Sequence, residues 1–214
     1  MCNTRYDEFN SPLVDGARFT GAYDLPMLAR VAFQPTRAVP FHACNIAADK
    51  NQWIHFYEHD YRFECVWNNP PRYLPLFKKF SGVITPDFSL YRDMPIAMQI
   101  WNTYRNRAIG FWLQQNGICV VPNVRWGDER TYPFAFDGLR QGGTVAISTC
   151  GCIADAKDRF YFRSGLKKLA ERIAPETIIC YGQMPEDIFD VASLKGIRLI
   201  NIENYAKTVR KAAP

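Results

Sequence analysis

The chain has 214 residues, of which 48% are hydrophobic and 22% charged, which excludes a disordered or low-complexity protein and allows a sizeable core. Its formal net charge of +5 allows anionic partners, although a dedicated nucleic-acid-binding module usually carries a larger basic excess. The seven cysteines are odd in number and scattered, which indicates reduced thiols. We find no secretory signal and no apolar stretch of membrane-spanning length, so we expect a cytoplasmic protein without a membrane partner.

The first 36 residues are irregular and carry Pro and Gly at the spacing of turns. They predict an N-terminal arm, residues 1–36, that packs on the rest of the chain and contains a short helix around residues 25–32. Residues 37–214 show no internal repeat and no linker, and we predict that they form a single α/β domain.

Seven short apolar runs, rich in Val, Ile and aromatic residues, follow the arm. Most of them do not alternate between apolar and polar residues, which is typical of strands covered on both faces of a parallel sheet. The predicted strands lie within residues 39–44, 53–58, 82–87, 118–123, 144–149, 177–182 and 197–202.

Helical stretches separate the later runs. The clearest is 94–117, with Pro near its start and Gly at its end. Its apolar face is predicted to contain Ile96, Ile100, Tyr104, Ala108, Phe111 and Trp112. A second helix is expected over 155–176, interrupted at Gly165, and further helices over 72–79, 185–196 and 203–213.

This alternation of strands and helices predicts either a TIM-like incomplete barrel or an open, mostly parallel sheet. The link between the first two strands, "NIAADKNQ", conflicts with both because it is too short for a crossover helix. Either this first pair is antiparallel or one of the two strands is assigned wrongly.

Polar and aromatic side chains follow nearly every predicted strand. In both architectures ligands bind at the carboxyl ends of the strands, so these side chains are predicted to form a site. Asp87, in "TPDFS", follows a buried strand and suits a general base or nucleophile. The predicted catalytic carboxylates are Asp87, Glu58 and Asp60, and the predicted substrate-binding residues are Ser89, Asn123, Arg125, Trp126, Thr149 and Tyr181.

Each of these residues also has a structural interpretation. Arg125 could hold a phosphate, or it could form a salt bridge with Asp87 or Asp128. Trp126 could stack on a planar ligand, or it could cover the core. Asp93, just before the long helix, suits an N-cap, and Asp137, before Gly138, suits a turn.

Metal-binding patterns are weak. His55 and His59 are four residues apart but lack the zinc-protease motif, and Cys150 and Cys152 lack the second pair of a structural zinc site. We therefore expect no structural zinc. A divalent metal held by Glu58, Asp60 and Asp87 stays open.

The second helical stretch carries a basic stripe, since Arg159, Arg163 and Lys167 are spaced four residues apart and share one face. Such a stripe suits either a nucleic-acid-binding patch that follows a phosphate backbone or a solvated outer face.

The segment that begins "VITPDFSLYRDMP" and ends "VVPNVRWGD", with "FAFDGL" and "VAISTCGC" after it, resembles a family of bacterial and phage proteins. That family is catalogued as a domain of unknown function (number 4417), and the resemblance extends over nearly the whole chain. It implies no assigned activity. Because members are common in phages and mobile elements, it favours roles in nucleic-acid metabolism or in countering host defence.

Two hypotheses follow. The first is an enzyme, a hydrolase or transferase, that acts on a nucleotide or nucleic acid by glycosidic transfer or phosphoester hydrolysis. The second is a non-catalytic module that binds nucleic acid or a host protein, for example in replication or counter-defence. Sequence does not determine the substrate, the metal requirement or the oligomeric state.

Overall fold

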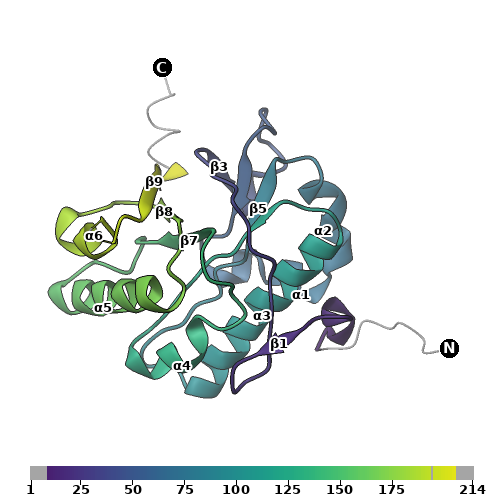
Figure 1. Ribbon diagram of the computed structural model, residues 1–214. Coiled ribbons are helices and arrows are strands. Elements are labelled where there is room, and N and C mark those ends of the chain that lie inside the picture. The colour runs from purple at the N-terminus through teal and green to yellow at the C-terminus, as the bar shows by residue number, and fades with distance from the viewer. Residues whose placement is uncertain (1–8, 194, 206–214) are drawn as a thin grey trace.

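The computed structural model describes residues 9–193 and 195–205, which form an α/β fold with parallel sheets (Figure 1). One sheet has the order β3-β4-β5-β6 and another the order β7-β8-β9, and every neighbouring pair in both sheets is parallel. A parallel bridge between Asn123 and Ala146 joins the end of β6 to β7, so the strands follow one another in chain order. Each strand lies within or beside a predicted run: β3 (Ala38–Pro40), β4 (Trp53–His55), β5 (Gly82–Ile84), β6 (Val120–Val121), β7 (Thr144–Ser148), β8 (Thr177–Tyr181) and β9 (Arg198–Ile202).

The first two of these strands are parallel, which resolves the conflict over their short link. The predicted strand 39–44 is too long at its carboxyl end, because β3 ends at Pro40 and Phe41–Ala43 forms the short 3-10 helix η2. Residues 41–52 are therefore free to make the return. Such a short crossover suffices because a strand of only three residues needs a short return.

Helices cover the outer faces of the strands. The helices α1 (Glu64–Asn68), α2 (Pro70–Phe77) and α3 (Ile96–Gln115) accompany β3–β6, while α5 (Ala156–Arg172) and α6 (Glu186–Ser193) accompany β7–β9 (Figure 1). The single turn α4 (Tyr132–Ala135) follows the 3-10 turn η4 (Glu129–Thr131). Along the strands, alternate residues pack outward against these helices, as Ile54, Val83 and Val145 do.

The inward residues of the strands form an apolar cluster of their own. Trp53, Ile84, Val121, Ala146 and Ile179 all belong to it, one from each strand between β4 and β8. The series of strands is strongly curved, because side chains at the carboxyl ends of distant strands touch. The Tyr181 ring at the end of β8 has its centroid 4.2 Å from that of His55 in β4 and 5.1 Å from that of Tyr57.

The N-terminal segment corrects one prediction, since residues 25–32 do not form a helix. Instead β1 (Phe19–Thr20) pairs antiparallel with β2 (Leu25–Pro26), after the 3-10 turn η1 (Ser11–Val14). Pro26 explains the difference, because a proline pushes the preceding residue toward extended backbone. Leu25 is fully buried and packs in a small cluster with Leu90 and Phe134.

The helix α5 corrects another prediction, because it runs through Gly165 without a break. A Cβ atom at this position would lie 2.1 Å from Nε1 of Trp126. The glycine therefore allows the helix to approach that indole closely and does not end it. Helix α6 agrees with the third predicted helix, whereas the fourth, 203–213, lies almost wholly outside the described residues. In the part of the chain that the structure describes, no helix combines the length and apolar character needed to cross a bilayer.

Candidate functional site

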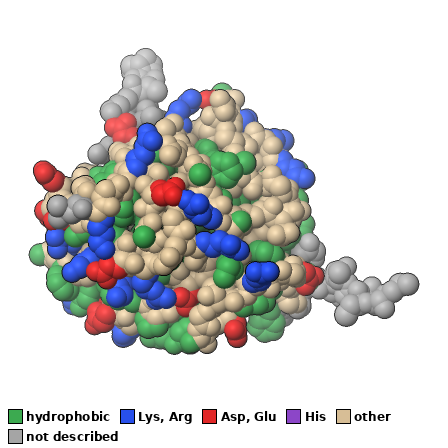
Figure 2. Space-filling view, in the orientation of Figure 1, with side chains coloured by type: hydrophobic (Ala, Val, Ile, Leu, Met, Phe, Trp, Pro, Cys, Tyr) green, Lys and Arg blue, Asp and Glu red, His purple; other side chains and the backbone are tan. Residues whose placement is uncertain are grey.

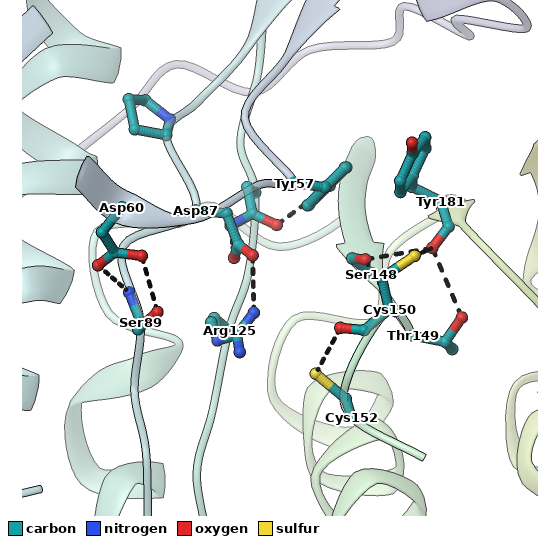
Figure 3. Close-up of polar contacts among 12 residues, drawn as sticks. Tyr57, Asp60, Asp87, Ser89, Arg125, Ser148, Thr149, Cys150, Cys152 and Tyr181 are labelled. Carbon is teal, nitrogen blue, oxygen red and sulfur yellow. Dashed lines mark hydrogen bonds and ion pairs between the residues drawn. The ribbon is translucent and has the colours of Figure 1, made fainter. Parts of the chain in front are cut away.

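Polar side chains that follow β4 to β8 gather at one edge of the sheets (Figure 3). Asp87 lies at the centre of this group. Its Oδ1 accepts a hydrogen bond from Nδ2 of Asn123 at 2.7 Å, and its Oδ2 forms an ion pair with Nη1 of Arg125 at 2.6 Å. The prediction that Arg125 pairs with either Asp87 or Asp128 is thus decided in favour of Asp87. Asp128 instead caps η4 and pairs with Arg130.

The Asp87 carboxylate is almost wholly removed from water, at 7% exposure. Burial raises its pKa above the usual value for an aspartate, while Arg125 and Asn123 oppose this rise and the charge of Asp60 adds to it. Burial lowers the pKa of Arg125, but the negative charges around it, that of Asp87 foremost, together outweigh this effect. Asp87 is therefore a carboxylate that takes up a proton more readily than one in water, beside a permanently positive group.

A single helix holds the two loops that carry this pair. Asn106 of α3 donates hydrogen bonds to Oγ1 of Thr85 at 3.0 Å and to the carbonyl oxygen of Pro86 at 2.6 Å, directly before Asp87. Oγ1 of Thr85 in turn accepts a hydrogen bond from the backbone N–H of Asn123 at 2.8 Å. These bonds fix the carboxyl ends of β5 and β6 relative to each other, and with them Asp87 and Asn123.

Arg107 of α3 extends this support to the loop after β6. It is 1% exposed and donates to the carbonyl oxygens of Asn123 at 3.1 Å, Ala135 at 2.8 Å and Asp137 at 2.9 Å. Asn106 and Arg107 were not among the predicted site residues. The sequence "RNR", within the segment that carries the family resemblance, could have indicated them. Polar residues in the middle of a helix that faces a sheet need buried partners.

Asp87 and Arg125 lie in the wall of a pocket of about 590 Å³, here called the Asp87 pocket. Its aromatic side chains are Tyr91, Trp126, Tyr161 and Phe162. Its charged side chains, besides the central pair, are Arg92, Asp93, Asp128, Lys157 and Asp158. A pocket of this volume suits a small molecule of the size of a nucleotide.

Most charges of the Asp87 pocket are paired. Arg92 forms an ion pair with Asp158 at 2.6 Å. Lys157 is exposed in the first turn of α5 and forms no ion pair with a described residue, so its ammonium group is available to an anionic ligand. The prediction that Asp93 caps α3 is wrong, because Pro95 occupies the N-cap position and the exposed Asp93 lies at the pocket wall.

Trp126 combines both of its predicted interpretations. It is 8% exposed, and its ring centroid lies 5.2 Å from that of Phe162 and 6.2 Å from that of Phe136, so most of it is core. It also forms part of the pocket wall. Asp137 serves in a turn, as predicted, since Gly138 has a φ of +77° and Asp137 accepts a hydrogen bond from Arg172 at 2.8 Å.

Glu58 and Asp60 occupy separate positions from Asp87. Glu58 is bound by His42, with Oε2 2.6 Å from Nδ1 of that imidazole. Asp60 lies in the 3-10 turn η3 (Asp60–Arg62) and accepts two hydrogen bonds from Ser89, from its backbone N–H at 3.0 Å and its hydroxyl at 2.7 Å (Figure 3). Ser89 is thus a buried anchor between two loops and does not line the Asp87 pocket.

The described residues do not assemble a set of metal ligands at this edge of the sheets. Among the described residues, no three His, Cys, Asp or Glu side chains lie together as a metal site would require. The structure therefore does not bring Glu58, Asp60 and Asp87 together as ligands. His55 is buried in the core, His59 is exposed, and Cys150 and Cys152 are free thiols, as are the other described cysteines.

Beyond β7 and β8 lies a second pocket of about 640 Å³, here called the Gln183 pocket. Thr149 is in its wall and donates a hydrogen bond to the carbonyl oxygen of Gln183 at 2.7 Å. Tyr181 is buried instead, its ring stacked on Tyr57 and its hydroxyl accepting a hydrogen bond from the backbone of Tyr205 at 3.0 Å. Tyr57 donates to Oδ1 of Asn123 at 3.1 Å, which connects this aromatic pair to Asp87.

The basic stripe of α5 is largely neutralised by α6. Arg159 forms an ion pair with Asp187 at 2.6 Å and Arg163 forms one with Asp190 at 2.7 Å. Lys167 is exposed and forms no ion pair with a described residue. Figure 2 shows acidic side chains among the basic ones on this side of the molecule.

Comparison with known proteins relates this chain to a protein family. The model of a family described as "Domain of unknown function (DUF4417)" matches residues 17–202. The "Gene 1 protein" of Mycobacterium phage D29 is 40% identical over 169 residues, which cover 77% of this chain and 62% of that protein. The "Gene 1 protein" of Mycobacterium phage L5 is also 40% identical over 169 residues, covering 77% of this chain and 73% of that protein. No solved structure matches the chain.

Proposed function

The chain belongs to the family described as "Domain of unknown function (DUF4417)", and we propose that it is an enzyme that acts on a nucleotide bound in the Asp87 pocket. The observation that carries this proposal is the Asp87 carboxylate itself, a buried group with a raised pKa at the wall of a nucleotide-sized pocket. Acids with perturbed pKa values in clefts are typical of catalytic sites.

The location of the pocket supports the same proposal. The contacts between the rings of β4 and β8, and the inward cluster shared by β4 to β9, favour a TIM-like incomplete barrel. In such barrels the active site lies at the carboxyl ends of the strands, and Asp87, Arg125 and Ser148 come from the ends of β5, β6 and β7. The relatives are phage proteins, with which a substrate from nucleic-acid metabolism is compatible.

The side chains suit the parts of a nucleotide. The exposed Tyr91 offers an aromatic face for a base, Arg92 lies over the ring of Tyr161 at 4.8 Å, and Lys157 offers a positive charge for a phosphate. Asp87 would accept the proton of a water or hydroxyl group as its oxygen bonds to the sugar carbon, and until then its negative charge would stabilise the positive charge that develops on the sugar. The bond between that carbon and the base would break, and the base would leave with the bonding electrons and take up a proton from water. Arg125 and Asn123 hold the carboxylate in place during this step.

Replacing Asp87 by asparagine tests the proposal. Asp87→Asn keeps the shape of the side chain and removes its proton affinity, so turnover of a nucleotide should fall by at least about 100-fold. Wild type and variant would be incubated with nucleotides and short oligonucleotides, and the products would be identified by mass spectrometry.

Asp187→Asn provides the matched control. It removes a carboxylate that pairs with Arg159 between α5 and α6, outside the Asp87 pocket, and should leave turnover unchanged. A folded Asp87→Asn variant with full activity would disprove the catalytic role of Asp87. Equal binding of intact oligonucleotide by wild type and Asp87→Asn, without any product, would instead favour the non-catalytic binding module.

A further inference from the structure

The Asp87 pocket and the Gln183 pocket adjoin each other. Gly151 lies in the wall of both, and Cys152 and Cys150 on either side of it line the first and the second pocket respectively. The loop between the pockets is held in place from within, because the backbone N–H of Cys150 donates to Oγ of Ser148 at 3.1 Å and that of Cys152 to the carbonyl oxygen of Thr149 at 3.1 Å. The dividing wall is therefore a single ordered turn after β7 (Figure 3).

The dividing turn carries no side chain at its middle. A Cβ atom added to Gly151 would meet no other atom within 4 Å, so the space beside this glycine is open. A ligand that extends from one pocket into the other would cross the wall at this point. The side chains before and after Gly151 line different pockets, and the glycine itself adds no side chain between them.

The two pockets differ in chemistry. Among the described residues, the wall of the Gln183 pocket contains no Lys or Arg, whereas that of the Asp87 pocket contains three. The polar groups of the Gln183 pocket are hydroxyl and amide groups together with Glu203. Its apolar surface comes from Ile153, Met184 and Pro185. This combination suits an uncharged ring with hydrogen-bonding edges better than a phosphate.

Two amide groups of the Gln183 pocket are available for such a ligand. Asn201 uses its Nδ2 to donate to the carbonyl oxygens of Gly182 at 2.6 Å and Cys180 at 3.2 Å, and its Oδ1 accepts no hydrogen bond from a described residue. The exposed side chain of Gln183 forms no hydrogen bond with a described residue either. Together they present an oriented acceptor and a free amide, the groups that distinguish the edges of bases.

We infer that the Gln183 pocket is a second subsite that binds the uncharged nucleoside part of a neighbouring nucleotide. This inference rests on the proposed function of the Asp87 pocket and extends it. Each pocket has a volume within the usual range of a small-molecule site, so the two together can hold two adjoining units. The substrate class is then a dinucleotide or two adjoining units of a nucleic-acid strand, with the reacting unit at Asp87 and its neighbour beyond Gly151.

The test compares mononucleotides with 5′-phosphorylated dinucleotides of the ribose and deoxyribose series, titrated calorimetrically at fixed salt. Wild type should bind the preferred dinucleotide about tenfold or more tightly than the corresponding mononucleotide, because a second base gains apolar contacts and hydrogen bonds along its edge. Ala154→Trp would fill part of the Gln183 pocket from an exposed position in its wall. This variant should lose the preference while keeping the affinity for the mononucleotide.

The control is Ala48→Trp, which adds the same side chain at an exposed site between β3 and β4, away from both pockets. It should keep the wild-type preference. Equal affinities of wild type for both ligands, or a preference that survives in Ala154→Trp, would overturn the second subsite while leaving the Asp87 pocket intact. Failure of every nucleotide to bind would overturn the proposed function, and the second subsite with it.

Discussion

Asp87 and His55 are both buried ionisable residues at the carboxyl ends of neighbouring strands. They differ in whether an opposite charge lies beside them. Asp87 keeps a positive neighbour, Arg125, at 2.6 Å. His55 is 0% exposed and has no counter-charge among the described residues, so burial, together with the nearby His42, lowers its pKa to about 3. Its Nδ1 accepts the backbone N–H of Tyr57 at 3.1 Å, which places the imidazole proton on Nε2, where no described residue accepts it. His55 is therefore a neutral core residue beside Tyr181.

This neutral histidine predicts how stability depends on pH. The folded-state pKa of about 3 lies below the ordinary 6.5, so the unfolded chain takes up the proton first as pH falls. Stability is thus fully present above pH 6.5 and declines from there toward pH 3, by up to about 1.4 kcal/mol per pH unit. His55→Phe should flatten this decline, measured by urea unfolding between pH 7 and about pH 4.5.

The exposed His59 offers the comparison for this prediction. His59→Phe makes the same change at the surface and should keep the wild-type slope of stability against pH. If His55→Phe retains that slope as well, other groups cause the loss of stability in acid and the neutral state of His55 contributes little to it.

At the scale of elements, the helices and strands were predictable where one periodic pattern dominated. Parallel strands buried on both faces gave unbroken apolar runs, and α3 followed its Pro and Gly signals to within two residues. The predicted apolar face of α3 explains only part of its packing, because the opposite face buries Asn102 and Asn106, and Arg107 is buried beside Ile100 and Phe111 on the predicted face itself. Such polar burial depends on acceptors supplied by distant loops, which periodicity does not contain.

The site was predictable to the same degree. The positions of polar residues just after the predicted strands identified Asp87, Asn123 and Arg125. In the structure Asn123 and Arg125 both bind the Asp87 carboxylate. It also grouped Glu58 with them, although His42 binds that carboxylate elsewhere. The difference arises in the turns after the strands. There the backbone conformation of one loop residue determines where the following side chain points.

The close packing of α5 on the loop after β6 predicts an unusual effect of a helix-favouring substitution. Gly165→Ala should stabilise an isolated helix by about 1 kcal/mol. Here the added methyl group would meet the Trp126 indole at 2.1 Å, so we expect a net loss of about 1–3 kcal/mol in the free energy of unfolding. Denaturant titration followed by tryptophan fluorescence would measure it.

The neighbouring Ser164→Ala is the matched change on the same helix. Ser164 is half-buried in α5, and its substitution should alter stability by less than about 0.5 kcal/mol. A Gly165→Ala variant as stable as wild type would mean that the helix can move away from Trp126, and that the close approach is not essential to the fold.

At the scale of the whole molecule, the net charge of +5 does not form a continuous basic patch on the face that Figure 2 shows. Acidic and basic side chains alternate over much of the face shown in Figure 2, and α6 supplies the partners of Arg159 and Arg163. Ion pairs of this exposed kind contribute little stability but do cancel the field that a phosphate backbone would meet. The basic stripe of α5 is accordingly a weaker candidate for a nucleic-acid interface than the pocket edge.

Neutralising the stripe distinguishes these two surfaces. The combined variant Arg159→Gln, Arg163→Gln and Lys167→Gln should change oligonucleotide affinity by less than about threefold and leave its salt dependence unaltered. Lys157→Gln, a single change in the Asp87 pocket, should instead reduce the slope of log affinity against log salt by about one. Affinities would be measured across a sodium chloride series. A fall of two or more in the slope for the combined variant would establish the stripe as the interface.

The junction between β6 and β7 has a consequence for how the protein folds during its synthesis. Two backbone hydrogen bonds of 2.8 Å cross it, from Val124 to Ala146 and from Ala146 to Pro122. During synthesis the ribosome releases β3 to β6 with α1 to α3 first, and this part has an outer core of its own. Its inward residues Trp53, Ile84 and Val121, however, share their cluster with residues of β7 and β8. The Asp87 pocket also needs Ser148, Cys152 and α5, which emerge later. A nascent chain thus completes both its inward cluster and its ligand site only when the last third of the polypeptide has emerged.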